Sequence, residues 1–276
     1  MKPLLEDLTD GPMRFGLYTN GTLLDDAWVE LLQATRRCSH VTISLDGFED
    51  YHDGIRGSGM FRRTLAGIER LVSVGIPVKI AGVVSHDNYR AIPEFARFLE
   101  SLPICEYKFS MRGDAAYGED ELCGELNLEE KVEFFLSMER IRSELKKIGS
   151  SSAPFPLLSQ LRHPRPVAEI APCCRDPLTT FAVLPDGSVP VCASYDDAPV
   201  AGWIGKQRVI DIWNGSVMNE FREQQRCGQE LPWEKCGDCE HRQSCRKYCP
   251  KLEKVWLCRK EIAEALAKVE QMVECS

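Results

Sequence analysis

Short apolar runs alternate with helical periods in the first part of the chain. The apolar runs have the length of buried strands and are bounded by polar or turn residues. There are four of them: Arg14–Thr19, Val41–Leu45, Val78–Val84 and Tyr107–Met111. Runs of this kind, separated by helical patterns, are typical of strands in a parallel sheet. The pattern therefore predicts an α/β fold in which right-handed crossovers bring the four strands together.

Helical periods fill the segments between these runs. Helices are predicted over Asp25–Gln33 and Met60–Val74, and Gly75 stands where a left-handed cap would end the second one. Asn88 is in position to cap a third helix that runs to about Leu99. Functional side chains of such a sheet gather at the C-terminal ends of its strands.

The pattern changes after the fourth strand. Asn127 and Glu130 have the spacing of a capping box, for a helix that reaches about Lys147. A stretch rich in serine and proline follows, and we place the domain boundary there. The expected division is an α/β domain at residues 1–115, a helical linker at 116–166, a Cys-rich domain at 167–260 and the end of the C-terminal helix at 261–276.

The last third of the chain predicts shorter elements. Asp186-Gly187 between two apolar runs predicts the tip of a β-hairpin. An amphipathic helix is expected over Val209–Arg226, and another from about Leu252 to Val273.

Composition narrows the class of protein. Hydrophobic residues make up 43% of the 276 residues, enough for a globular core, and the net charge of -8 argues against binding to nucleic acid or to an anionic membrane. No segment has the length and apolarity of a signal peptide or a membrane span, so a cytoplasmic location is expected. Thirteen cysteines in a reducing compartment favour metal or redox chemistry over disulfides.

Seven of these cysteines form an ordered array near the end of the chain. Five are spaced Cys-x2-Cys-x5-Cys-x3-Cys-x8-Cys, and two stand upstream with Gly187 between them. The seven are Cys174, Cys192, Cys236, Cys239, Cys245, Cys249 and Cys258. Thiolates are the usual ligands of iron-sulfur clusters, so seven of them, with Cys173 beside the first, suffice for about two [4Fe-4S] clusters.

This array resembles the SPASM domain, a two-cluster extension at the C-terminus of many radical S-adenosylmethionine (SAM) enzymes. The resemblance implies that Cys236, Cys239, Cys245 and Cys258 bind one cluster, while Cys249 joins Cys174 and Cys192 on the other. The fourth ligand of the second cluster stays open: it is Cys173, or one iron is left free for substrate.

A zinc module is the alternative for the same residues. Four of the cysteines, Cys236, Cys239, Cys245 and Cys249, would then close one tetrahedron, with His241 as a possible substitute. Zinc would leave the other three cysteines of the array without a role. The remaining ones (Cys38, Cys105, Cys123, Cys227 and Cys275) are expected to be incidental or buried thiols.

The first half of the chain resembles the latter part of the radical SAM partial barrel. The residues that carry this resemblance are Thr19-Asn20-Gly21-Thr22 and Ser44-Leu45-Asp46-Gly47 with His52-Asp53 and Arg56. It implies that Ser44 and Arg56 bind the ribose and the methionine carboxylate of SAM, with Asp46 nearby. A guanidinium can form two parallel hydrogen bonds with a carboxylate, and a hydroxyl can hydrogen-bond to ribose oxygens.

The sequence departs from that family in one respect. Such enzymes cleave SAM with a cluster bound by Cys-x3-Cys-x2-Cys, and this spacing does not occur here. The Gly-Gly-Glu-Pro motif is also missing. We expect a fragment of a longer enzyme, or else a natural partial protein, and in either case a chain that does not cleave SAM alone. The strand at Arg14–Thr19 would then present a sheet edge that needs covering.

The resemblance implies a function. Full-length members make a 5'-deoxyadenosyl radical that abstracts hydrogen, commonly from a peptide or protein, and their auxiliary clusters accept an electron or hold the substrate. A ferredoxin or flavodoxin would supply electrons. The alternative, from a different class, is a non-catalytic iron-sulfur or zinc protein that binds a peptide.

Overall fold

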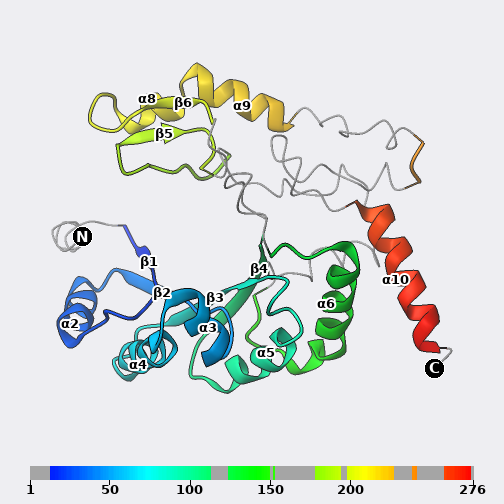
Figure 1. The fold of residues 1–276 in the computed structure, drawn as a ribbon. Helices are drawn as coiled ribbons and strands as arrows, with labels where there is room; N and C mark the ends of the chain where they lie inside the picture. Colours follow the sequence, from blue (N-terminus) through cyan, green and yellow to red (C-terminus); the bar gives the residue numbers. More distant parts are fainter. Residues whose placement is uncertain are drawn as a thin grey trace. The chain divides into compact units, whose positions relative to one another are not determined.

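The computed structural model describes residues 13–112, 124–149, 152, 178–193, 198–226, 238–240 and 258–274. The chain divides into two compact units, Met1–Arg112 with Gly124–Leu158, and Gly113–Cys123 with Ser159–Ser276. We call them unit 1 and unit 2 and describe each by itself (Figure 1).

Unit 1 is built on one parallel sheet of four strands in the order β1-β2-β3-β4. The strands are β1 (Phe15–Thr19), β2 (Cys38–Ser44), β3 (Val78–Val84) and β4 (Glu106–Met111). Sequence neighbours are neighbours in the sheet, as expected when each crossover returns beside the strand it left. The predicted α/β class and the parallel sheet are confirmed.

Side chains alternate between the two faces of this sheet, and helices cover one face. On that face Val41, Ile43, Ile80 and Tyr107 are at most 1% exposed. Burial raises the pKa of Tyr107, whose hydroxyl donates a hydrogen bond to Glu100. This face is the hydrophobic core of unit 1.

Helices α2 (Asp26–Thr35) and α4 (Met60–Ser73) lie close to the predicted ranges. Asp25 caps α2 by accepting a hydrogen bond from the backbone of Trp28, and Gly75 adopts the expected positive φ of 77° after α4. A further helix, α3 (Glu49–Arg56), forms where no helix was predicted, because its short and polar sequence carries little apolar periodicity.

Helix α5 (Ile92–Ser101) begins three residues later than a cap at Asn88 would place it. Ala91 stands at its N-terminus without a side-chain cap, and Pro93 lies in its first turn. The prediction that Asn88 caps this helix is wrong, because its amide binds the loops after β2 and β3 instead.

Helix α6 (Leu128–Arg140) has the predicted capping box, with both hydrogen bonds between Asn127 and Glu130. It ends before Lys147, and a short 3-10 helix, η2 (Arg142–Glu144), follows. The chain then returns to the sheet, where the backbone of Tyr107 bonds to Lys147 and Gly149 at the outer edge of β4. The end of the segment predicted as helix is therefore paired with the sheet instead.

The described part of unit 2 contains a small antiparallel pair, β5 (Ser188–Pro190) and β6 (Val200–Trp203). The turn predicted at Asp186-Gly187 forms, with Gly187 at φ 84° and the Asp186 carboxylate accepting hydrogen bonds from Ser188. The apolar run before the turn is not the partner strand, however. β5 pairs with β6, which follows it in sequence.

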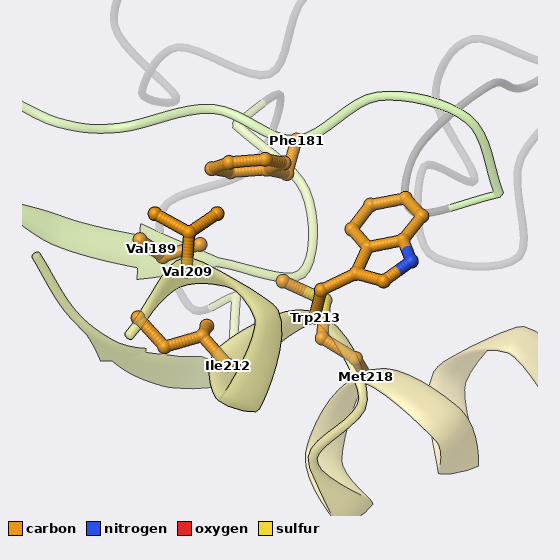
Figure 2. Close-up of a pocket in the computed structure, with 6 residues that line it drawn as sticks. All are labelled: Phe181, Val189, Val209, Ile212, Trp213 and Met218. Carbon is orange, nitrogen blue, oxygen red and sulfur yellow. The ribbon is translucent and has the colours of Figure 1, made fainter. Parts of the chain in front are cut away.

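The amphipathic segment predicted as one helix is two, α8 (Val209–Trp213) and α9 (Ser216–Arg226), which Asn214-Gly215 separates. Their apolar side chains pack on β5 and form the core of unit 2: Val189, Val191, Ile212, Met218 and Phe221. Figure 2 shows the side chains around a narrow recess beside this core, which leaves no space for a water molecule. All six of its lining residues are apolar, so the recess belongs to core packing.

The last helix, α10 (Arg259–Glu274), begins later than the predicted helix, whose first residues lie outside the described ones. Among the described residues, no helix combines the length and the apolar character needed to cross a membrane.

Candidate cofactor and cluster sites

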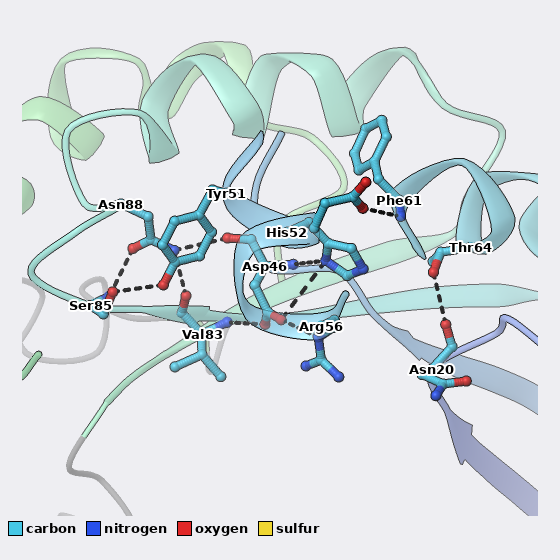
Figure 3. A network of polar contacts seen from close by, with 11 residues as sticks. Asn20, Asp46, Tyr51, His52, Arg56, Phe61, Thr64, Val83, Ser85 and Asn88 are labelled. Carbon is cyan, nitrogen blue, oxygen red and sulfur yellow. Dashed lines mark hydrogen bonds and ion pairs between the residues drawn. The ribbon is translucent and has the colours of Figure 1, made fainter. Parts of the chain in front are cut away.

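Asp46 is a buried carboxylate just beyond the C-terminal end of β2, with its side chain 2% exposed. One oxygen, Oδ1, accepts a hydrogen bond of 3.0 Å from the backbone of Val83, the penultimate residue of the neighbouring strand β3. The other, Oδ2, lies 2.6 Å from Nε of Arg56 (Figure 3). The carboxylate therefore joins two strand ends to the last turn of α3.

Arg56 extends from α3 over these strand ends, and its side chain is 32% exposed. Only Nε meets Asp46, and among the described residues neither terminal amino group of the guanidinium has an acceptor. The arrangement fixes the plane of the guanidinium and leaves its forked end for an anion. A carboxylate matches that fork in charge and in geometry.

His52 lies beneath this ion pair and is completely buried. Its Nδ1 accepts the backbone N–H of Asp46 at 3.3 Å, so the proton of the neutral ring is on Nε2. Burial lowers the pKa of His52, although the Asp46 carboxylate opposes the shift. The imidazole therefore supports the strand end in its neutral form.

Asn88 ties the two loops that frame the site. Its amide group donates to the carbonyls of Asp46 and Val83, both at 2.8 Å, while its oxygen accepts from the backbone of Ser85. The hydroxyl of Ser85 lies 2.8 Å from that of Tyr51 on α3 (Figure 3). These contacts hold α3, and with it Arg56, against the ends of β2 and β3.

Asp53 has a structural role in the same region. Its carboxylate accepts hydrogen bonds from the backbone of Gly59 and Phe61 at the start of α4. Those N–H groups, Phe61 foremost, lower the pKa of Asp53. Asp53 therefore caps the start of α4 from the preceding turn, a structural role that its sequence context favours.

Ser44 is the last residue of β2 and is partly exposed on the face of the sheet away from the helices. The structure thus brings Ser44, Asp46 and Arg56 to one end of the sheet. His52 and Asn88 complete that group. His52 belongs to the segment that carries the resemblance but had no predicted role, and Asn88 was predicted only as a helix cap, because neither residue's local sequence indicates a partner distant in the chain.

The predicted cluster ligands are only partly described. Cys192 is buried two residues after β5, and Cys239 and Cys258 are half-buried. Cys174, Cys236, Cys245 and Cys249 lie outside the described residues. Within the described ranges, no three acidic, histidine or cysteine side chains gather as a metal site.

Comparison with known families gives two matches along the chain. Residues 2–99 match the radical SAM superfamily, and residues 172–240 match the iron-sulfur cluster-binding domain called SPASM. The first range includes Ser44, Asp46 and Arg56, and the second includes Cys174, Cys192, Cys236 and Cys239.

Curated relatives extend over most of the chain. The AdoMet-dependent heme synthase of Methanosarcina barkeri is 28% identical over 260 residues, which are 86% of this chain and 69% of that protein. The mycofactocin maturase MftC of Mycobacterium tuberculosis is 27% identical over 84% of this chain and 57% of its own length. The chain thus spans between about half and two thirds of these relatives.

A solved structure shows the same fold. Native anSMEcpe with bound AdoMet and a peptide superposes with a TM-score of 0.66 at 19% identity, over 94% of this chain and 76% of that one. The parallel sheet of unit 1 is therefore a partial radical SAM barrel. In sequence order, the chain matches first the radical SAM model and then the SPASM model, and it is similar to a mycofactocin maturase and to a heme synthase.

Proposed function

We propose that this chain is the C-terminal portion of a radical SAM/SPASM enzyme that modifies a peptide or protein. In that enzyme the end of the sheet in unit 1 holds SAM, and the cysteine array holds two auxiliary [4Fe-4S] clusters. The observation that carries the proposal is the guanidinium of Arg56, fixed through Nε on buried Asp46 with its forked end open.

The site fits the polar end of SAM. Arg56 binds the methionine carboxylate, and the partly exposed hydroxyl of Ser44 pairs with the ribose. Asp46 has both oxygens engaged within the protein, so it acts as a positioning residue for Arg56. Bound SAM supplies the radical chemistry once an additional cluster reduces it.

That additional cluster comes from outside the sequence given. The 276 residues contain no Cys-x3-Cys-x2-Cys spacing, so this polypeptide alone does not cleave SAM. In the complete enzyme, a ferredoxin or flavodoxin delivers the electrons.

The cysteine array supports iron rather than zinc. Its spacing uses seven thiolates, and residues 172–240 match a domain described as iron-sulfur cluster-binding. One cluster is held by Cys236, Cys239, Cys245 and Cys258, the other by Cys174, Cys192 and Cys249. The clusters transfer electrons or hold the substrate, with potentials set by the burial of their sulfurs. Buried Cys192 belongs to a well-packed part of unit 2.

The relatives favour a peptide substrate. The related MftC is a maturase, and the solved structure of similar fold contains a peptide. A porphyrin substrate is the second candidate, because a heme synthase is related over 86% of this chain. A zinc-bearing or iron-bearing protein that only binds a peptide is the non-enzymatic alternative.

Titration calorimetry with SAM under anoxic conditions tests the cofactor site. Replacing Arg56 with alanine is expected to weaken SAM binding about tenfold or more, since a charged hydrogen bond of roughly 1.5 to 3 kcal/mol is lost. The matched control is Arg62→Ala, because Arg62 is 79% exposed and pairs with Glu49 on the surface. Equal affinities for wild type and Arg56→Ala would contradict this site.

Iron and sulfide analysis after anoxic purification tests the clusters. Cys192→Ala and Cys258→Ala are each expected to remove one cluster, about four irons, whereas Cys105→Ala, an exposed thiol on unit 1, should remove none. Stoichiometric zinc with negligible iron and sulfide in the folded wild type would contradict the cluster assignment.

A further inference from the structure

The sheet of unit 1 has a second face, which none of the described helices of that unit covers. Residues that are paired across parallel strands point to the same side, so the register defines this face. Its polar members include His40, Thr42, Ser44, Lys79, Glu106, Lys108 and Ser110. We call it the polar face. Its outer positions are open, as the 67% exposure of Tyr18 in β1 shows.

The charges on the polar face do not balance locally. Lys79 and Glu106 pair at 2.9 Å, and the hydrogen bond to Glu106 raises the pKa of Lys79. Lys108, two residues further along β4, has no acceptor among the described residues. Lys108 is therefore a positive charge on the polar face that no described acidic side chain pairs with.

The register places Lys108 beside the proposed cofactor site. Ser44 and Lys108 both pair with Ala81 of β3, one from each side, so their strands are separated by two strand spacings, about 10 Å. Val83, 39% exposed, is the next residue of β3 on this face, where it pairs with Ser110. An anion at Lys108 would have an apolar side chain and a hydroxyl as neighbours.

We propose that Lys108 binds a carboxylate of the substrate and thereby orients the substrate against SAM. This inference rests on the proposed function and narrows its substrate class to molecules that carry a carboxylate near the reacting carbon. The single positive charge of the Lys108 ammonium is neutralised by the single negative charge of a carboxylate. A dianionic phosphate would leave a net negative charge on a face that already carries Glu106, in a protein of net charge -8.

Lys108 acts here as a specificity-determining residue. Arg56 serves the cofactor from the end of the strands, and Lys108 serves the substrate from within the sheet. Because the strands of Ser44 and Lys108 lie ~10 Å apart, SAM at Ser44 and a substrate at Lys108 would bind at separate positions on the sheet.

The test uses 3-phenylpropanoate as probe and 3-phenylpropanamide as its uncharged counterpart, titrated by NMR into the whole purified chain. Wild type is expected to bind the carboxylate at least about fivefold more tightly than the amide, since one charged hydrogen bond distinguishes the two. Lys108→Met should abolish this preference and Lys108→Arg should retain it. Equal binding of both probes to wild type, or an unchanged preference in Lys108→Met, would overturn the proposal.

The control is Lys146→Met, because Lys146 is another lysine of unit 1 without a described partner; it is exposed, whereas Lys108 is half-buried, and it lies outside the sheet. Circular dichroism and the urea midpoint establish that each variant is folded. SAM is titrated separately, and Lys108→Met should bind it within about twofold of wild type. A tenfold loss of SAM affinity would assign Lys108 to the cofactor and overturn the proposal. Failure of every variant, wild type included, to bind SAM would instead count against the proposed function alone.

Discussion

Arg56 reaches back ten residues to place its Nε 2.6 Å from the carboxylate of Asp46, which is 2% exposed. The pair joins a helix end to a strand end, and its two members are unequally buried. Removing the cation leaves a buried negative charge, whereas neutralising Asp46 leaves a cation that is 32% exposed and can be hydrated.

The two substitutions should therefore differ in their effect on stability. Arg56→Ala is expected to lower the free energy of unfolding by about 2 to 4 kcal/mol, somewhat below the cost of breaking a fully buried pair. Asp46→Asn should cost about 1 to 2 kcal/mol, because the amide oxygen can still accept from Val83. Urea unfolding measures both, and a larger loss for Asp46→Asn would show that the burial argument is wrong.

The sheet was predictable from sequence because its strands carry apolar side chains at alternate positions. β3 was predicted to the residue, and the other three strands to within a few residues, since the burial of one face requires an apolar residue at every second position. Turn residues were equally informative at Gly75 and at Asn127, where the local sequence alone determines the cap.

The polar network was not predictable, because each of its contacts joins residues distant in sequence. Asn88 has the sequence of a helix cap, and only the fold brings it to the carbonyl of Asp46, 42 positions away. Helix α3 is too polar to show a periodic pattern, yet it carries Arg56. The break between α8 and α9 at Gly215 was underestimated, because an apolar period continues across it.

Asn88 holds the loops after β2 and β3 with three hydrogen bonds, which predicts a large effect of its removal. Asn88→Ala is expected to destabilise the chain by about 2 to 4 kcal/mol, because it leaves the buried carbonyl of Asp46 without its donor. Asp87→Ala, at the exposed neighbouring position, should stay within about 0.5 kcal/mol of wild type. Similar urea midpoints for the two variants would contradict the assigned role of Asn88.

The buried imidazole of His52 predicts a loss of stability in mild acid. Its pKa is lowered in the folded state, so the unfolded chain binds a proton more readily once the pH falls below about 6.5. Stability should be complete above that pH and decrease as the pH falls towards the lowered pKa. His52→Gln, which keeps an acceptor for the backbone of Asp46, should reduce the decrease between pH 7.5 and pH 5.5.

The remaining decrease in His52→Gln has an expected source. Burial also lowers the pKa of His40, which contributes in the same direction. Carboxylates with lowered pKa, such as that of Glu133 beside Arg90, lose their contribution only at more acidic pH. Urea midpoints at the two pH values measure the difference, and identical decreases in wild type and His52→Gln would contradict the assignment.

Two helical glycines of unit 1 should respond to the same substitution with opposite signs. Gly67 lies on the face of α4 that crosses the turn after β1, where an added Cβ would come 2.4 Å from the carbonyl oxygen of Gly21. Gly54 lies in α3, where a Cβ would meet nothing within 4 Å. Alanine is favoured over glycine in a helix by about 1 kcal/mol, so Gly54→Ala should stabilise the chain by about 0.5 to 1 kcal/mol. Gly67→Ala should destabilise it by about 1 to 3 kcal/mol, because backbone atoms on both sides must move apart. Urea unfolding of the two variants checks both signs, and a stabilising Gly67→Ala would mean that α4 lies further from the end of β1 than the structure places it.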